Sequence, residues 1–132
     1  SIYNLPIIKI TMKLKFLKLK FGTILLFEKL FKKNKLYIES GTSIIPLKTL
    51  RKKMYQVGRG VDITSEISLN SNELSRVHAT IEKRRLDYYL IDNFSKNGTF
   101  LNGERLAPGI PYILIHNDNI EMGDICIKYV RE

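Results

Sequence analysis

The residues of this chain that are best suited to chemistry lie in four short polar segments between positions 58 and 103. Each segment ends an apolar run, and loops that follow strands commonly present polar groups to ligands. We therefore expect an arginine, a serine and an asparagine to gather on loops at one rim of a sheet structure. Such groups suit the binding of a phosphate and an extended peptide better than a chemical reaction. The four segments are Gly58-Arg59, Ser75-Arg76-Val77-His78, Asn97-Gly98-Thr99 and Asn102-Gly103.

Arg59 is the first candidate ligand of a phosphate. It follows an apolar run at 55–57 and lies between two glycines, so the backbone can turn sharply there. The fixed fork of donors on its guanidinium matches a phosphate dianion. An isolated arginine after a strand is more often a solvated surface charge. The position of Arg59 in the ordered series is therefore what favours binding.

Ser75 is the second candidate, because its hydroxyl is followed directly by Arg76 and the pair could contact neighbouring oxygens of one phosphate. Ser75 could instead cap a short turn that ends at His78. Residues 77–83 alternate between apolar and polar types, as a strand does, and this favours the phosphate interpretation.

His78 could serve as a base or a metal ligand, but the only other histidine is His116 and no carboxylate cluster accompanies it. One histidine makes no metal site. We favour a structural histidine whose hydrogen bonds brace the Ser75 loop. The sequence also offers no paired acids, no nucleophile with a base and no Gly-x-x-x-x-Gly-Lys-Ser/Thr phosphate loop, so we expect no enzyme activity, metal or cofactor.

An all-β domain must position these segments, because short runs rich in Ile, Val, Tyr and Leu alternate with turn residues from about Leu36 onward. The two Asn-Gly pairs supply the positive backbone angles of tight turns. The alternation over 77–82 predicts a strand with one apolar and one polar face. We expect strands near 36–39, 44–48, 54–58, 67–69, 77–83, 87–92, 99–101, 104–106, 111–115, 119–122 and 125–131.

The net charge of +9 is concentrated in residues 1–35, which hold nine lysines and one acidic residue, whereas residues 36–132 carry a net charge of only +1. We therefore predict a basic amphipathic extension, 1–35, and one folded domain, 36–132. The extension is open to three interpretations: a patch for a lipid surface or nucleic acid, an element that packs on the sandwich or a second subunit, and a solvated tail. Lysines without arginine argue against base-specific contacts.

Within the extension, residues 12–21 alternate as strands do, and residues 23–33 place apolar residues at helical spacing. No apolar run there approaches the roughly 18 residues of a membrane-spanning helix, and no small-residue cleavage site completes a secretory signal. The single cysteine, Cys126, excludes an intrachain disulfide and is compatible with a reducing compartment. We therefore expect an intracellular protein.

The three linked motifs Gly-Arg, Ser-Arg-x-His and Ser-x-Asn-Gly-Thr-Phe-x-Asn-Gly resemble the signature of the forkhead-associated (FHA) domain. Here they are Gly58-Arg59, residues 75–78 and residues 95–103, and the resemblance covers about residues 36–131. It implies a β-sandwich of eleven strands whose apical loops bind phosphothreonine peptides without catalysis. It also implies a small apolar niche for the γ-methyl group of the phosphothreonine.

The same resemblance assigns roles to individual residues. It implies that Arg59 and Ser75 contact the phosphate directly and that Arg76 and Lys96 add further phosphate contacts. Asn97 would bond to the main chain of the peptide, since an amide can both donate and accept. The remaining motif residues would support the site: Gly58, His78, Gly98, Thr99, Asn102 and Gly103.

Residues 106–112 and 122–129 have a fainter similarity to the closing strands of FHA domains in DNA-damage checkpoint mediators, which self-associate when phosphorylated. This similarity implies DNA-damage or cell-cycle signalling, a location in the nucleus rather than the cytoplasm, and a phosphorylation-dependent homodimer. The alternative function is a lysine-rich binder of anionic lipid or nucleic acid that uses the sandwich as its scaffold.

Overall fold

The computed structural model of the chain describes residues 31–60 and 66–132. The alternating pattern at 12–21 and nearly all of the helical pattern at 23–33 lie outside the described residues. Lys33–Glu132 forms one compact unit. The predicted boundary after residue 35 stays a prediction, although the first strand already begins at Asn34.

Eleven strands make up the described part of the chain, which confirms the predicted all-β sandwich. Strands form where β-branched and aromatic residues can cover a pleated surface. Their bounds are β1 Asn34–Ser40, β2 Ser43–Leu50, β3 Met54–Arg59, β4 Ile67–Leu69, β5 Ala79–Arg84, β6 Asp87–Asp92, β7 Thr99–Leu101, β8 Glu104–Arg105, β9 Tyr112–Ile113, β10 Asn119–Met122 and β11 Ile125–Arg131.

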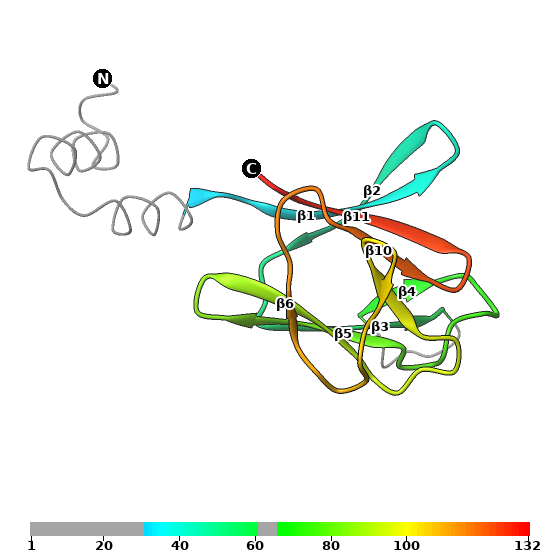
Figure 1. Ribbon diagram of the computed structural model, residues 1–132. Coiled ribbons are helices and arrows are strands. Elements are labelled where there is room, and N and C mark those ends of the chain that lie inside the picture. Colours follow the sequence, from blue (N-terminus) through cyan, green and yellow to red (C-terminus); the bar gives the residue numbers. More distant parts are fainter. Residues whose placement is uncertain (1–30, 61–65) are drawn as a thin grey trace, which may run out of the picture. The chain divides into compact units, whose positions relative to one another are not determined.

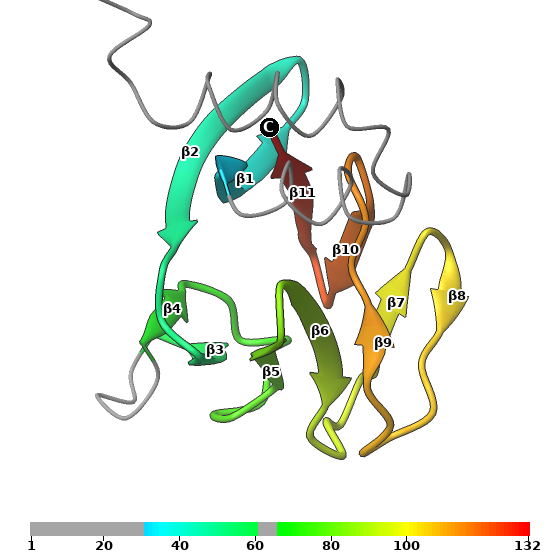
Figure 2. The ribbon, with the colours of Figure 1, turned by 90° about the vertical axis from the view of Figure 1, so that its left-hand side faces the viewer.

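The strands form two sheets that lie face to face (Figure 1). The six-stranded sheet has the order β2-β1-β11-β10-β7-β8, and the five-stranded sheet has the order β4-β3-β5-β6-β9. Among these described strands, the pairing of β3 with β4 is parallel and the other pairs are antiparallel. Figure 2, turned by 90°, shows the strands of both sheets around a common interior.

The core fills the space between the two sheets, as in other aligned sandwiches. Inward-facing residues from both sheets are nearly inaccessible to solvent and form one apolar cluster, to which the loop residue Leu74 also belongs. The cluster comprises Leu36, Leu50, Tyr55, Val57, Ile67, Leu69, Leu74, Ala79, Ile81, Tyr88, Leu90, Leu106, Leu114, Ile120, Met122, Ile127 and Tyr129.

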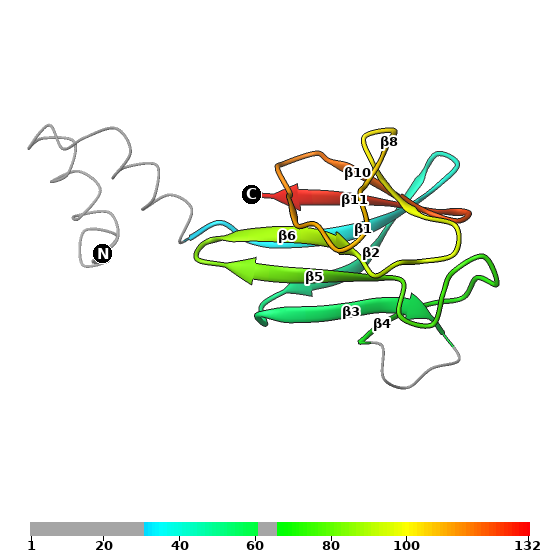
Figure 3. The ribbon, with the colours of Figure 1, turned by 60° about the horizontal axis from the view of Figure 1, so that its bottom comes forward.

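One end of the sandwich gathers the segments that matter for the site. The end of β3, the β4–β5 loop, the β6–β7 loop and the β10–β11 turn all lie at this end (Figure 3). Polar residues that are distant in the sequence are thereby brought to one edge.

The predicted bounds of the strand at 77–83 are wrong. The strand begins at Ala79, because the ring of His78 turns inward and the His78 backbone N–H donates to Val57 O at the end of the ladder. The polar face of this strand is covered, since His78 is fully buried and Thr80 is 8% exposed. Both side chains form hydrogen bonds to neighbouring loops. His78 bonds to Ser75 and Gly98, and Thr80 bonds to Asn93.

Among residues 31–60 and 66–132, no helix has both the length and the apolar character needed to cross a membrane. In the same ranges, no three His, Cys, Asp or Glu side chains gather in a way that could hold a metal ion.

Candidate functional site

Arg59 is the last residue of β3, at the end where the recognition segments meet. Its backbone N–H donates to Ser75 O at 3.1 Å, and the next residue, Gly60, donates to Leu69 O at 2.8 Å. These bonds tie β3 to the segment that leads from β4 to β5. The Nε atom of Arg59 is buried and has no hydrogen-bond partner in the described part of the chain.

The Ser75 hydroxyl lies between the β4–β5 and β6–β7 loops. Its oxygen accepts a hydrogen bond from the backbone N–H of Lys96 at 3.0 Å. A hydroxyl has one proton to donate, and the Ser75 hydroxyl donates no hydrogen bond to residues 31–60 or 66–132. The Ser75 side chain therefore fixes the position of Lys96 and keeps a donor available.

His78 connects the same two loops from beneath. The backbone N–H of Ser75 donates to His78 Nδ1 at 3.1 Å, so Nδ1 is the acceptor and Nε2 carries the proton. His78 Nε2 then donates to Gly98 O at 2.8 Å, and the ring is fully buried. These are the bonds expected of a bracing histidine, while its importance for ligand binding stays a prediction.

Asp92 organises the β6–β7 loop, and sequence reasoning missed it. Its buried carboxylate accepts bonds from the hydroxyls of Ser95, at 2.5 Å, and Thr99, at 2.7 Å, and from the Ser95 backbone N–H. Ser95 Oγ in turn accepts from the Gly98 N–H. The sequence signal that could have identified Asp92 is an acidic residue three positions before a serine, at the end of an apolar run. Such acidic side chains commonly accept hydrogen bonds that close a turn.

Asn97 is held by the β4–β5 loop. One of its side-chain N–H groups donates to the backbone carbonyl of Glu73 at 2.7 Å. An asparagine amide has two donors and one carbonyl oxygen, so one N–H and Oδ1 are left to meet a ligand. Gly98 has a φ of +85°, as the predicted tight turn requires.

A surface depression of about 500 Å³ brings together every residue predicted to contact a phosphate or a peptide. Its charged lining is mainly basic, with Arg59, Arg76 and Lys96 against the single acid Glu73. The full lining is Arg59, Asn72, Glu73, Leu74, Ser75, Arg76, Lys96 and Asn97.

Asn102 and Gly103, which were predicted only to support the site, do not line this depression. Both have positive φ and form the turn between β7 and β8. The Asn102 side chain donates to Asp118 and accepts from the Asn119 N–H. This turn is thus anchored to the start of β10, and it follows the end of β7 that lies away from the depression.

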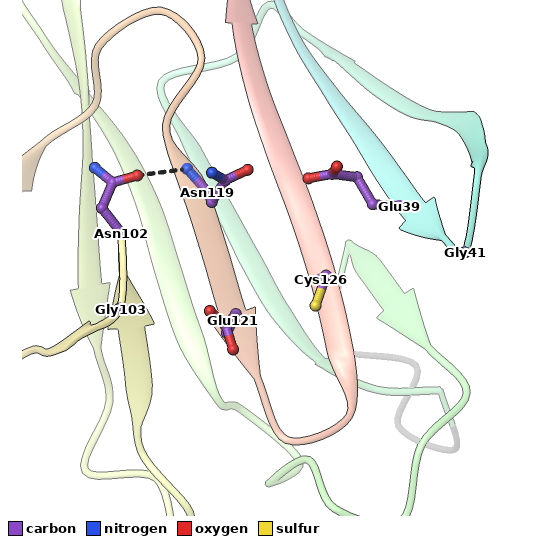
Figure 4. Close-up of a pocket in the computed structure, with 7 residues that line it drawn as sticks. All are labelled: Glu39, Gly41, Asn102, Gly103, Asn119, Glu121 and Cys126. Carbon is purple, nitrogen blue, oxygen red and sulfur yellow. Dashed lines mark hydrogen bonds between the residues drawn. The ribbon is translucent and has the colours of Figure 1, made fainter.

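A second depression, of about 510 Å³, lies on the outer face of the six-stranded sheet (Figure 4). It is lined by Glu39, Gly41, Asn102, Gly103, Asn119, Glu121 and Cys126. Glu39 and Glu121 pair with Cys126 from the strands on either side. Burial, together with these carboxylates, raises the pKa of the Cys126 thiol above its usual value. The surroundings disfavour negative charge, so this depression suits neither a thiolate nor a phosphate.

The FHA domain model matches residues 55–123. The chain belongs to the FHA domain family.

The relatives of this FHA domain include much longer proteins. The E3 ubiquitin-protein ligase rnf8 of Danio rerio is 36% identical over 51% of this chain and 14% of its own length. The Smad nuclear-interacting protein 1 of Mus musculus is 29% identical over 75% of this chain and 29% of its own length. The chain thus spans less than a third of these relatives.

A solved structure from a structural and functional analysis of phosphothreonine-dependent FHA domain interactions has the same fold, with a TM-score of 0.62. It is 25% identical, and the match covers 74% of this chain and 95% of that chain.

Proposed function

We propose that this FHA domain is a protein interaction module that binds a phosphothreonine peptide in the depression lined by Arg59, Ser75 and Asn97. The observation that supports the proposal most strongly is the convergence of a guanidinium, a hydroxyl and two further cations on one hollow at the loop end of the sandwich. The relation to an FHA structure studied for phosphothreonine-dependent interactions points the same way.

The phosphate ligands are Arg59, Ser75, Arg76 and Lys96. Within the described ranges, neither Arg59 nor Lys96 forms an ion pair with an acidic side chain. Charge-assisted bonds from a guanidinium to a phosphate are short and strong. The available Ser75 proton adds a directed donor between the two loops. A phosphate dianion would therefore satisfy groups that the protein leaves open.

Asn97 binds the peptide main chain. Its bond to Glu73 O fixes the orientation of the amide, so that Oδ1 can accept from a peptide N–H and the second Nδ2 proton can donate to a peptide carbonyl. This pairing recognises an extended backbone without regard to side chains. The phosphate and the backbone are thus read by different residues.

Threonine is preferred over serine because buried Leu74 adds apolar surface to a lining that is otherwise polar. A phosphoserine lacks the γ-methyl group, and losing one methyl-sized contact costs about 1 kcal/mol. We expect phosphoserine peptides to bind several-fold more weakly.

The cellular location, the signalling role and further contacts of the protein are also part of the proposal. The relation to a nuclear-interacting protein supports a nuclear location, and a part in DNA-damage or cell-cycle signalling stays a prediction. Phosphorylation-dependent self-association stays a prediction. Contacts of residues 1–35 with lipid or nucleic acid also stay a prediction. Deletion of these residues would remove such contacts and leave phosphopeptide binding intact.

A phosphothreonine peptide array probed with residues 1–132 tests the proposal. We expect binding to phosphothreonine peptides, little binding to the same peptides with threonine, and loss of binding on Arg59→Ala. Arg84→Ala is the matched control, since Arg84 lies on β5 in an exposed ion pair with Glu82. No binding by the native chain, or undiminished binding by Arg59→Ala, would contradict the proposal.

A further inference from the structure

The β10–β11 turn touches the β4–β5 loop although no recognition motif includes it. Asp124, in this turn, accepts a hydrogen bond through Oδ1 from the hydroxyl of Ser71. Ser71 is buried, whereas Asp124 is exposed. The bond from Ser71 lowers the pKa of Asp124 below its usual value. The carboxylate is therefore charged at neutral pH and available as an acceptor.

Ser71 links Asp124 to Glu73 through hydrogen bonds. Its hydroxyl oxygen accepts from the backbone N–H of Glu73 at 3.1 Å while its proton goes to Asp124. Both hydrogen-bonding functions of the hydroxyl are thus used to fix the loop. The backbone carbonyl of the same Glu73 accepts the bond from Asn97 at 2.7 Å.

Gly123 makes the same turn fit closely against Glu73. Its φ is +56°, and a Cβ atom at this position would lie 2.7 Å from Glu73 Cβ and 3.3 Å from Glu73 C. Only a glycine allows the turn to approach this backbone so closely. Two independent contacts, one polar and one steric, therefore hold Glu73 in place from the six-stranded sheet.

We propose that Asp124, acting through Ser71 and Glu73, is a positioning residue that sets the orientation of the Asn97 amide in the recognition site. This inference rests on the proposed function, because its consequence is the affinity for a phosphothreonine peptide. The chain of bonds runs from Asp124 to Ser71, from Ser71 to Glu73 and from Glu73 to Asn97. Asp124 lies outside the lining of the depression and acts on the peptide only through this chain.

The charge of Asp124 and its hydrogen bond to Ser71 have opposite effects on the affinity for a phosphorylated peptide. Variants can therefore separate the two effects. Removing a negative charge near a phosphate site strengthens the binding of a dianion through long-range electrostatics. Removing the acceptor for Ser71 releases the loop and weakens binding. Asp124→Ala removes both the charge and the acceptor, whereas Asp124→Asn removes the charge and keeps an acceptor oxygen.

Calorimetric titration of residues 1–132 with an array-selected phosphothreonine peptide tests the inference. We expect Asp124→Ala and Ser71→Ala to weaken binding by about fivefold, the worth of one modest hydrogen bond. Asp124→Asn should bind like the native chain or slightly more tightly. Glu121→Ala is the matched control, because it removes a carboxylate from β10 on the outer face of the sheet.

A double-mutant cycle with Asn97→Ala decides whether Asp124 acts through Asn97. In the Asn97→Ala background, Asp124→Ala should cause no further loss of affinity. An equal loss in both backgrounds, or equal affinities of Asp124→Ala and Asp124→Asn in the native background, overturns the inference. Failure of the native chain to bind any phosphothreonine peptide instead overturns the proposed function.

The side-chain amide resonances of Asn97 provide a readout that needs no peptide. We expect Asp124→Ala to shift the Asn97 Nδ2 proton signals and to speed their exchange with water, while Glu121→Ala leaves them unchanged. Unaltered Asn97 signals in Asp124→Ala would overturn the chain of bonds as a positioning device, whether or not a peptide is found.

Discussion

At the scale of single residues, His78 holds the two recognition loops together. We predict that His78→Ala lowers the free energy of unfolding by about 3 kcal/mol, because the Ser75 N–H and the Gly98 carbonyl both lose their partner. Urea denaturation measures this loss. His116→Ala is the control, since His116 is exposed and accepts one bond from the Arg131 N–H. Equal losses in the two variants would contradict the bracing role.

The motif residues could be predicted from the sequence, because a guanidinium, a hydroxyl and an amide at fixed spacing carry their chemistry with them. Arg59, Ser75 and Asn97 do meet in one depression. The supports of the site left much weaker signals. Ser71 and Asp124 are 53 positions apart, and the acceptor that holds Asn97 is a backbone carbonyl, which every residue has. Only the fold brings such groups together.

At the scale of elements, the two glycine turns at positions 103 and 123 differ in what surrounds them. Both glycines have positive φ, but a Cβ atom on Gly103 would meet nothing within 4 Å, whereas one on Gly123 would collide with Glu73. Gly103→Ala should lower the free energy of unfolding by about 1 kcal/mol from backbone strain alone. Gly123→Ala should cost more, because the β4–β5 loop must also move.

Substitutions at Gly103 and Gly123 also separate effects on stability from effects on peptide binding. Gly123→Ala should weaken binding of a phosphothreonine peptide about fivefold, since the displaced Glu73 carbonyl no longer holds Asn97. Gly103→Ala should leave affinity unchanged. Thermal unfolding and calorimetric titration of both variants measure the two effects. Equal affinities would show that the β10–β11 turn does not support the site.

The order and number of the strands could be predicted because turn residues separate the short runs rich in β-branched, aromatic and other apolar residues. The ends of strands could not, because tertiary contacts decide them. The run at 111–115 pairs only at Tyr112–Ile113. Pro111 has no N–H to offer the ladder. The Leu114 N–H still bonds to Tyr88 O in the same register, but the next N–H, that of Ile115, donates to the Asp118 carboxylate instead. The shift of β5 to Ala79 likewise follows from the inward turn of His78.

At the scale of the whole molecule, two buried tyrosines form hydrogen bonds to segments that are distant in the sequence. Tyr88 donates to Lys52 O, and Tyr129 donates to Asn34 Oδ1. Burial raises the pKa of each phenol to about 12, against an ordinary value of about 10. The stability gained by keeping them neutral is therefore complete below pH 10 and is lost as the pH rises towards 12.

Urea unfolding at a series of pH values between 9 and 12 tests this expectation. The midpoint should fall steeply above pH 10, and the fall should be smaller in Tyr88→Phe and Tyr129→Phe, which each lack one ionisable phenol. The two variants also separate the tyrosines from the lysines that titrate in the same range. A slope that is the same in all three proteins would contradict the assignment.

The charge of the whole chain is separate from its proposed site. Residues 36–132 carry a net charge of only +1, although the chain carries +9. Recognition should therefore depend on a few placed groups at the loop end of the sandwich and not on bulk attraction. The two depressions differ in the same way, since the charged residues that line one are mainly basic and those that line the other are acidic.

Mapping of backbone amide shifts on adding a phosphothreonine peptide tests the central claim most directly. The account predicts shifts at Arg59, at residues 72–76 and at residues 95–98, and none when the peptide carries unmodified threonine. Shifts centred on Glu39, Glu121 and Cys126, or identical shifts with both peptides, would contradict it.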